Sequence, residues 1–227
     1  MKKIIFAILA LSITSVIFYS CTNENQEKES INSKITTFEN KIQLTNRNDY
    51  KLTELNNNAN NYNTSGTKFY NTIQNVKSII WKSKDNKKSF EDIKPQIENL
   101  LKSESTTKIN FNETEKVLLE SYLKRFNVQN GIELSIEYEN FAIENFKNQK
   151  EISNFLIIVA QLKHLSFIIK PLTESTQKTY RQWEACTNAC MQDRYEEMNI
   201  VDWVGHVASG LVGGVAWNYA GCSYGCL

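Results

Sequence analysis

The sequence contains little of the turn chemistry that a β-rich protein needs. Its 227 residues include only 8 glycines and 2 prolines, whereas a β-sandwich or barrel places a turn after every short strand. Helices need far fewer turns. With 41% apolar residues, the chain can bury one sizeable core. The composition therefore favours a single all-α domain.

Histidine is also scarce, and catalytic motifs with a recognisable spacing are missing. Only His164 and His206 occur, and we expect His164 to be a partly exposed helical residue without a catalytic partner. No H-E-x-x-H, G-x-G-x-x-G or phosphate-loop pattern is present. Ser209 is not in a G-x-S-x-G elbow, because Val207 replaces the first glycine. We therefore expect no enzymatic activity, cofactor or metal. A catalytic pair of carboxylates that lie far apart in the sequence is the open alternative.

The charge is nearly balanced, with a formal net charge of +1. We find no basic stripe with interleaved aromatic residues, which is the pattern typical of nucleic-acid binding. A nucleic-acid partner is therefore not expected.

The first 21 residues have the three regions of a secretory signal. Residues 1–3 are basic, residues 4–18 are apolar, and Ser20 precedes Cys21. This end resembles the lipobox of bacterial lipoproteins. The resemblance implies that residues 1–20 are removed, that Cys21 is acylated, and that the chain belongs to the cell envelope. An ordinary signal peptide with a chance cysteine is the alternative.

A polar stretch follows the cysteine. Residues 21–33 are poor in large apolar side chains, so we expect a flexible tether. Thr22 rather than aspartate follows Cys21, which in the lipoproteins that this end resembles favours the outer membrane, with the periplasmic or surface face undecided. The expected partners are the membrane, through the lipid, and an unknown envelope protein.

Most of the remaining chain shows apolar residues at spacings of three and four, which predicts helices. The predicted helices cover residues 35–42, 69–81, 92–100, 112–126, 132–146, 151–170 and 173–198. The segment 151–170 is the most apolar and should be the central helix. We expect an irregular bundle of about six or seven helices over residues 34–180.

Several local signals predict where helices begin and end. Asn112 and Glu115 have the spacing of a capping box. Asp92 should cap the next helix, with Pro95 in its first turn. The lysine-rich segment 82–88 should be a solvated turn, and the asparagine-rich segment 56–61 should be a loop.

Four of the five cysteines form two C-x-x-x-C pairs, Cys186/Cys190 and Cys222/Cys226. Residues i and i+4 share a helix face, so two such helices side by side can be joined by two disulfides. Local bridges within each pair, a zinc site and a redox site are alternatives. An oxidising envelope favours structural disulfides, whereas zinc and redox sites prefer C-x-x-C.

This pattern resembles the helical hairpins of the alpha-hairpinin group, which carry C-x-x-x-C on both arms. The resemblance implies that the outer cysteines pair, Cys186 with Cys226, and that the inner cysteines pair, Cys190 with Cys222. Residues 181–227 would then be a disulfide-linked helical hairpin packed on the bundle.

The two arms of such a hairpin would differ in length. Asn199 should end the first arm and Asp202 should cap the second. The second arm then reaches Cys222 over ~30 Å at 1.5 Å per residue, about twice the length of the first. A break must absorb the difference, and we expect it near Gly213 and Gly214, with Gly205–His206 as the second choice.

The apolar run between the cysteine pairs contains several small residues: Gly205, Ser209, Gly210, Gly213 and Gly214. Such residues let helices pack closely, either within a domain or in a membrane. Asp202, His206 and Asn218 make insertion costly, so we expect packing on the domain. The predicted role is structural or protein-binding; the alternative is a toxin-like or bacteriocin-like effector whose glycine-rich hairpin enters a membrane.

Overall fold

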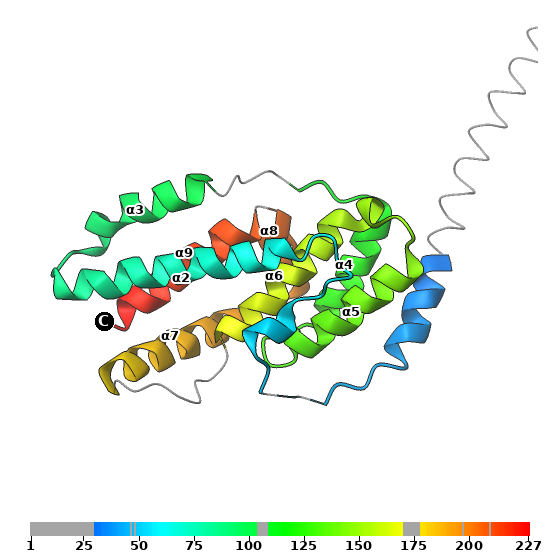
Figure 1. Cartoon of the computed structure of the whole chain (residues 1–227), viewed down its shortest axis with the longest axis horizontal. Coiled ribbons are helices and arrows are strands. Elements are labelled where there is room, and N and C mark those ends of the chain that lie inside the picture. The colour runs from blue at the N-terminus through cyan, green and yellow to red at the C-terminus, as the bar shows by residue number, and fades with distance from the viewer. Residues whose placement is uncertain are drawn as a thin grey trace, which may run out of the picture.

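The computed structural model describes residues 30–45, 47, 49–103, 109–169, 178–196, 198–208 and 210–227. Within these ranges the regular structure is entirely helical (Figure 1), which confirms the all-α prediction. The predicted signal peptide, Cys21 and most of the predicted tether lie outside the described residues. Residues 30–33, which we assigned to the tether, are helical because Ile31 and Ile35 form one buried stripe.

An N-terminal helix, described over residues 30–39, precedes eight α-helices and two short 3₁₀-helices in the described ranges. The elements are η1 Leu52–Leu55, α2 Thr64–Asp85, α3 Phe90–Ser103, α4 Glu113–Arg125, α5 Gly131–Asn145, η2 Gln149–Ile152, α6 Ser153–Ile169, α7 Lys178–Glu196, α8 Ile200–Ala208 and α9 Leu211–Gly225. The predicted helices correspond to these elements, with ends shifted by a few residues.

Helix α6 is the centre of the fold, as its apolar sequence predicts. It contacts α2, α4, α5, α7 and α9, and side chains on all its sides are buried. Among the described residues, one segment, Gln149–Ile169, is long and apolar enough to cross a membrane. Because 72% of its most apolar window is buried inside the protein, we assign it as the core helix.

The predicted capping box at the start of α4 is present and also joins α4 to α6. The Glu115 backbone N–H donates to Asn112 Oδ1 at 2.8 Å, and the Asn112 N–H donates to the Glu115 carboxylate at 3.1 Å. The same carboxylate accepts hydrogen bonds from the backbone N–H and side-chain amide of Asn154. One buried glutamate therefore satisfies donors at the first turns of two helices.

The start of α3 differs from the prediction. Ser89, not Asp92, occupies the capping position: the Asp92 N–H donates to Ser89 Oγ, and the Ser89 N–H donates to the Asp92 carboxylate. The helix therefore begins at Phe90, and Pro95 lies inside it rather than in its first turn.

The bundle is elongated, with its ends formed by different parts of the chain (Figure 1). The N-terminal helix lies at one end, where Phe38 stacks on Phe141 of α5 with ring centroids 4.3 Å apart. Glu39 in the same helix accepts hydrogen bonds from Ser121 of α4 and Tyr138 of α5. The α2–α3 turn and the end of α9 lie at the opposite end.

Candidate functional site: the disulfide-linked hairpin

Two disulfides join α7 to α9. Cys186 pairs with Cys226 and Cys190 pairs with Cys222, with Cα atoms 5.9 Å and 5.7 Å apart. This nested pairing confirms the one that the alpha-hairpinin resemblance implied, and it requires antiparallel helices. Local bridges within each C-x-x-x-C pair do not form. With all four sulfur atoms in disulfides, none is a thiolate that could bind zinc; among the described residues, no group of three or more His, Cys, Asp or Glu could hold a metal.

The break between the hairpin arms is not where the sequence predicted it. It lies at Gly210, between α8 and α9, and Gly210 has φ 97°, a conformation that only glycine adopts without strain. Gly213 and Gly214 are helical residues of α9, and Gly205–His206 lies inside α8. Both predicted positions were wrong, because the extra length forms a separate helix, α8, instead of bending one long arm.

The cap of α8 also differs from the prediction. Asn199 accepts a hydrogen bond from the Asp202 N–H at 3.1 Å through its side-chain oxygen, so Asn199 is the cap and Asp202 lies in the first turn. Trp203 follows and is buried, stacked on Tyr195 of α7 and edge-on to Phe126 at the end of α4. This indole packing holds α8 against the bundle.

The small residues of the apolar run have different surroundings. A Cβ atom at Gly214 would lie 2.8 Å from Nε2 of His206, so this glycine allows α8 and α9 to approach closely. A Cβ atom at Gly205, Gly221 or Gly225 would meet nothing within 4 Å. Ser209 lies outside the described residues. Close packing therefore explains Gly214, but not Gly205, Gly221 or Gly225.

The apolar face of α9 is buried in the domain. Helix α9 contacts α2, α3, α6, α7 and α8. Its fully buried residues include Leu211, Val215, Ala216, Tyr219, Ala220 and Cys222. Among the described large hydrophobic residues, those exposed by more than a third are Leu52, Val204 and Leu227. The hairpin thus packs on the bundle, and those of its side chains that the structure describes present no broad apolar face to solvent.

A polar cluster lies where α7, α8 and α9 meet. Arg194 donates to the side-chain oxygen of Asn218 at 3.0 Å, and the Asn218 amide donates to the Tyr195 hydroxyl at 3.1 Å. The same amide is 3.4 Å from Nε2 of His206. Burial lowers the pKa of His206, although Asp202 opposes this effect. The neutral imidazole therefore suits this position.

A partly buried ion pair connects α2 to α7. Lys77 pairs with Glu184, and its ammonium lies 5.2 Å from the centre of the Tyr180 ring. Burial alone lowers the pKa of Lys77, but Tyr219, Glu184 and Tyr180 together outweigh this and raise it. Nearby, Trp183 donates to the backbone oxygen of Ser223 in α9 at 2.7 Å. The ion pair fixes the hairpin to α2, and the Trp183 hydrogen bond joins the two arms of the hairpin.

A second polar cluster lies in the middle of the bundle, and we did not predict it. Lys163 of α6 lies 2.5 Å from a carboxylate oxygen of Glu139 in α5, and neither side chain is exposed. Asn60, in the predicted asparagine-rich loop, donates to the other carboxylate oxygen at 3.0 Å. The one signal in the sequence is a lysine in the middle of an otherwise apolar helix.

His164 is next to this cluster and is buried, not partly exposed as we predicted. Its side chain is 1% exposed, and Nδ1 lies 2.8 Å from the backbone oxygen of Ala160. A carbonyl oxygen can only accept, so Nδ1 carries the proton. Burial lowers the pKa of His164 to about 4. Gly66 of α2 packs against the ring, because a Cβ atom there would lie 2.4 Å from Nδ1.

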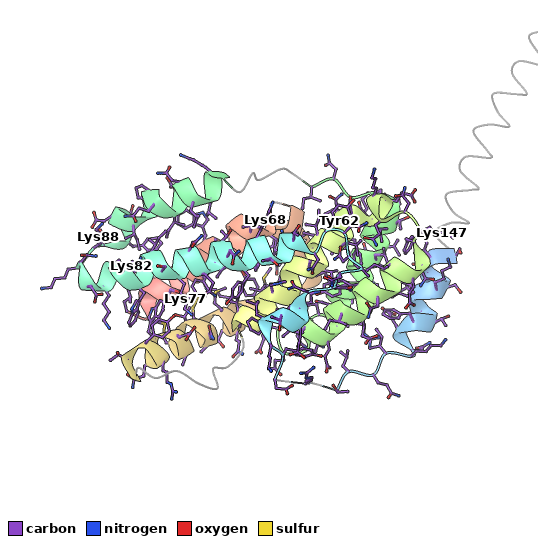
Figure 2. The ribbon with its side chains drawn as sticks, viewed as in Figure 1. Tyr62, Lys68, Lys77, Lys82, Lys88 and Lys147 are labelled. Atoms are coloured by element: carbon purple, nitrogen blue, oxygen red, sulfur yellow. A yellow bond between two sulfur atoms is a disulfide. The ribbon has the colours of Figure 1, made fainter. Side chains whose placement is uncertain are left out.

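Among the described surfaces of the chain, the disulfide-linked end is the most distinctive. It combines a covalently fixed helix pair with the exposed α2–α3 turn beside it (Figure 2). Comparisons with protein-family models, with curated proteins and with solved structures gave no match.

Proposed function

We propose that this chain is a lipid-anchored protein of the cell envelope, acylated at Cys21, with a structural or protein-binding role. The observation that carries the proposal is the pair of nested disulfides between α7 and α9, because such bonds persist in oxidising compartments and are rare in the cytosol. The lipobox-like sequence before Cys21 supplies the matching export signal and anchor.

The arrangement of the ends supports a role in holding or bridging. The N-terminal helix, which follows the predicted tether, lies at the end of the bundle opposite the end of α9 (Figure 1). Glu39 attaches this helix to the bundle by hydrogen bonding, and Phe38 and Ile35 attach it by apolar packing. A lipid on Cys21 would therefore attach the protein through the N-terminal helix, at the end of the bundle opposite the disulfide-linked end. The presence of Thr22 after Cys21 favours the outer membrane as the membrane that holds the anchor.

Replacement of Cys21 tests the anchor. We expect Cys21→Ser to release the protein from the membrane fraction, and mass spectrometry of the wild-type N-terminal peptide to show the mass of the acyl chains. Membrane fractionation that is unchanged in the variant would refute lipidation. Four free thiols in protein isolated from the envelope would refute the structural role of the disulfides.

The membrane-inserting alternative requires α9 to leave the core. That step would expose Leu211, Val215 and Tyr219, and the two disulfides would keep α9 attached to the polar helix α7. We therefore favour the interaction role. A dye-release assay with the oxidised, intact protein on liposomes tests this choice, because release at low protein-to-lipid ratio would favour the toxin-like alternative.

A further inference from the structure

Exposed lysines gather at the end of the molecule opposite the N-terminal helix. Four of them lie in the last turn of α2 and in the turn that follows it: Lys82, Lys84, Lys87 and Lys88. Asp85 is the one acidic residue of residues 82–88, which we call the lysine tip. Figure 2 shows Lys82 and Lys88 at this end and Lys147 at the other.

The lysine tip consists of the end of α2, through Asp85, and the ordered turn after it, whereas the sequence predicted a solvated turn over residues 82–88. The Lys88 N–H donates to the Ser83 backbone oxygen at 3.1 Å, and the Lys87 N–H donates to the Lys84 oxygen at 3.2 Å. Lys87 takes the left-handed conformation, with φ 50°, which commonly ends a helix. The side-chain amide of Asn86 donates to the Lys82 oxygen. The positions of the lysine backbones are therefore defined.

Helix α9 of the disulfide-linked hairpin contacts the lysine tip. The Tyr224 hydroxyl of α9 donates to the Lys88 backbone oxygen at 3.3 Å, and the Tyr224 ring lies 5.2 Å from the ring of Phe90. Cys226, two residues further on, is fixed to Cys186. Lys84 Nζ lies 4.8 Å from the centre of the Trp81 ring. The lysine tip thus sits on a base of half-exposed aromatic rings, a combination typical of groups that meet a membrane interface.

Nearby acidic side chains have other contacts. Asp92 accepts hydrogen bonds from the backbone and hydroxyl of Ser89, and Glu91 lies 4.0 Å from Lys94. Asp85 lies within the tip, and Asp92 is near enough to Lys88 to interact with its charge. Four lysines against these two carboxylates still leave the tip with a net positive charge. An exposed turn does not enclose a small ligand, but several ammonium groups can meet an extended array of phosphates as point charges.

We propose that the lysine tip binds the anionic phospholipid headgroups of a second membrane, facing the membrane that holds the lipid anchor. The proposal rests on the proposed function, since the anchor at the other end makes the protein a bridge. Each lysine near an anionic membrane strengthens binding about fivefold. Many anchored copies acting together turn this modest gain into stable adhesion.

Vesicle bridging by the full-length protein tests the proposal. The protein purified from the envelope is reconstituted into neutral phosphatidylcholine vesicles, and fluorescent vesicles containing phosphatidylglycerol are added. We expect co-sedimentation of the two populations in 0.1 M salt, its loss in 1 M salt because of screening, and no bridging to a second neutral population.

Matched variants identify the surface responsible. Lys82→Gln, Lys87→Gln and Lys88→Gln together leave the Lys84–Trp81 contact in place and should weaken bridging roughly a hundredfold. The control carries the same three-charge change at the opposite end, Lys34→Gln, Lys41→Gln and Lys147→Gln, and should bridge like the wild type. Intact disulfides and an unchanged circular dichroism spectrum confirm that both variants are folded.

The outcomes separate the two proposals. Equal bridging by the tip variant and the wild type overturns the inference, and so does equal loss in both variants. Tip-dependent binding to soluble polyglutamate without vesicle bridging also overturns it, because it assigns the tip to an acidic polymer. Failure of the wild-type protein to float with neutral vesicles refutes the lipid anchor but not the binding of lipid headgroups by the lysine tip. Direct sedimentation of the same variants with anionic vesicles then decides the tip.

Discussion

The ammonium group of Lys163 lies 2.5 Å from a carboxylate oxygen of Glu139, and both side chains are fully buried. Burial lowers the pKa of Lys163, while the Glu139 charge opposes that effect. The two charges are therefore stable in the core only as a pair. Asn60 adds a hydrogen bond to the same carboxylate, so the cluster holds the segment before α2 against α5 and α6.

Breaking this pair should destabilise the protein strongly. We expect Lys163→Met to lower the free energy of unfolding by about 3–5 kcal/mol, because it leaves the Glu139 carboxylate buried without its counter-ion. Lys163→Met combined with Glu139→Gln removes that charge and keeps an acceptor for Asn60, so it should cost less than the single change. Urea unfolding measures both; a double variant that costs as much as Lys163→Met or more would contradict the coupling.

Replacing Gly131 or Gly221 with alanine should change the stability of the protein in opposite directions. A Cβ atom at Gly131 would lie 2.0 Å from Ser166 Oγ and 2.6 Å from the Phe126 ring, so Gly131→Ala should cost about 1–3 kcal/mol by forcing α5 and α6 apart. Gly221 is helical and its Cβ would meet nothing within 4 Å. Gly221→Ala should therefore raise the stability by about 1 kcal/mol.

Thermal unfolding of the two variants gives the comparison. A large loss of stability in Gly221→Ala would contradict the open surroundings of its Cβ position. Gly205→Ala offers a second case of the same kind, since nothing lies within 4 Å of its Cβ position either.

Stability should fall on mild acidification because of His164. The pKa of His164 in the folded protein is lowered from 6.5 to about 4, so the unfolded chain binds a proton more readily below pH 6.5. The stabilisation is complete above pH 6.5 and declines as the pH falls toward 4, by about 3 kcal/mol in all.

The variant His164→Asn tests this dependence. Asparagine does not titrate, and its amide can donate to the Ala160 oxygen in place of Nδ1. Between pH 7 and 5, where most carboxylates remain ionised, the unfolding free energy of the variant should change less than that of the wild type. Identical slopes would assign the acid sensitivity to other groups.

The two disulfides should differ in the ease of reduction. Cys186 is exposed and Cys226 is half-buried, whereas Cys222 in the inner bridge is buried. A reductant should therefore open Cys186–Cys226 first, since exchange depends on access to sulfur. Alkylation at increasing reductant concentration, followed by mass spectrometry, gives the order; earlier alkylation of Cys190 and Cys222 would contradict it. Replacing both pairs with serines should cost about 4 kcal/mol or more in the chain-entropy model, and replacing one pair should cost less, because the remaining bridge still constrains the unfolded chain.

The sequence predicted local features well and distant ones poorly. The apolar spacing of α6 and the capping box at Asn112 depend on neighbouring residues, so both were visible in the sequence. The break at Gly210 was missed because every glycine in the run offers the same backbone freedom. What selects Gly210 is the packing of Trp203 on Tyr195 and Phe126, which fixes α8 as a separate helix.

The candidate site shows the same division. The C-x-x-x-C spacing predicted which faces carry the cysteines, and a family resemblance was needed for their pairing. The support of the lysine tip by Tyr224 joins residues 136 positions apart, and the Lys163–Glu139–Asn60 cluster joins three separate segments. No short-range pattern contains such contacts, because they depend on how whole helices pack.

The contact of α2 with α9 has a consequence for the order in which the chain folds. One face of α2 is covered only when a segment more than a hundred residues later has been made, so this part of the bundle cannot close until α9 has been synthesised. A newly synthesised chain would keep that face open and remain unfolded for longer. On the proposed export route, this late closure would keep the chain open for threading through a translocation pore before the two disulfides form.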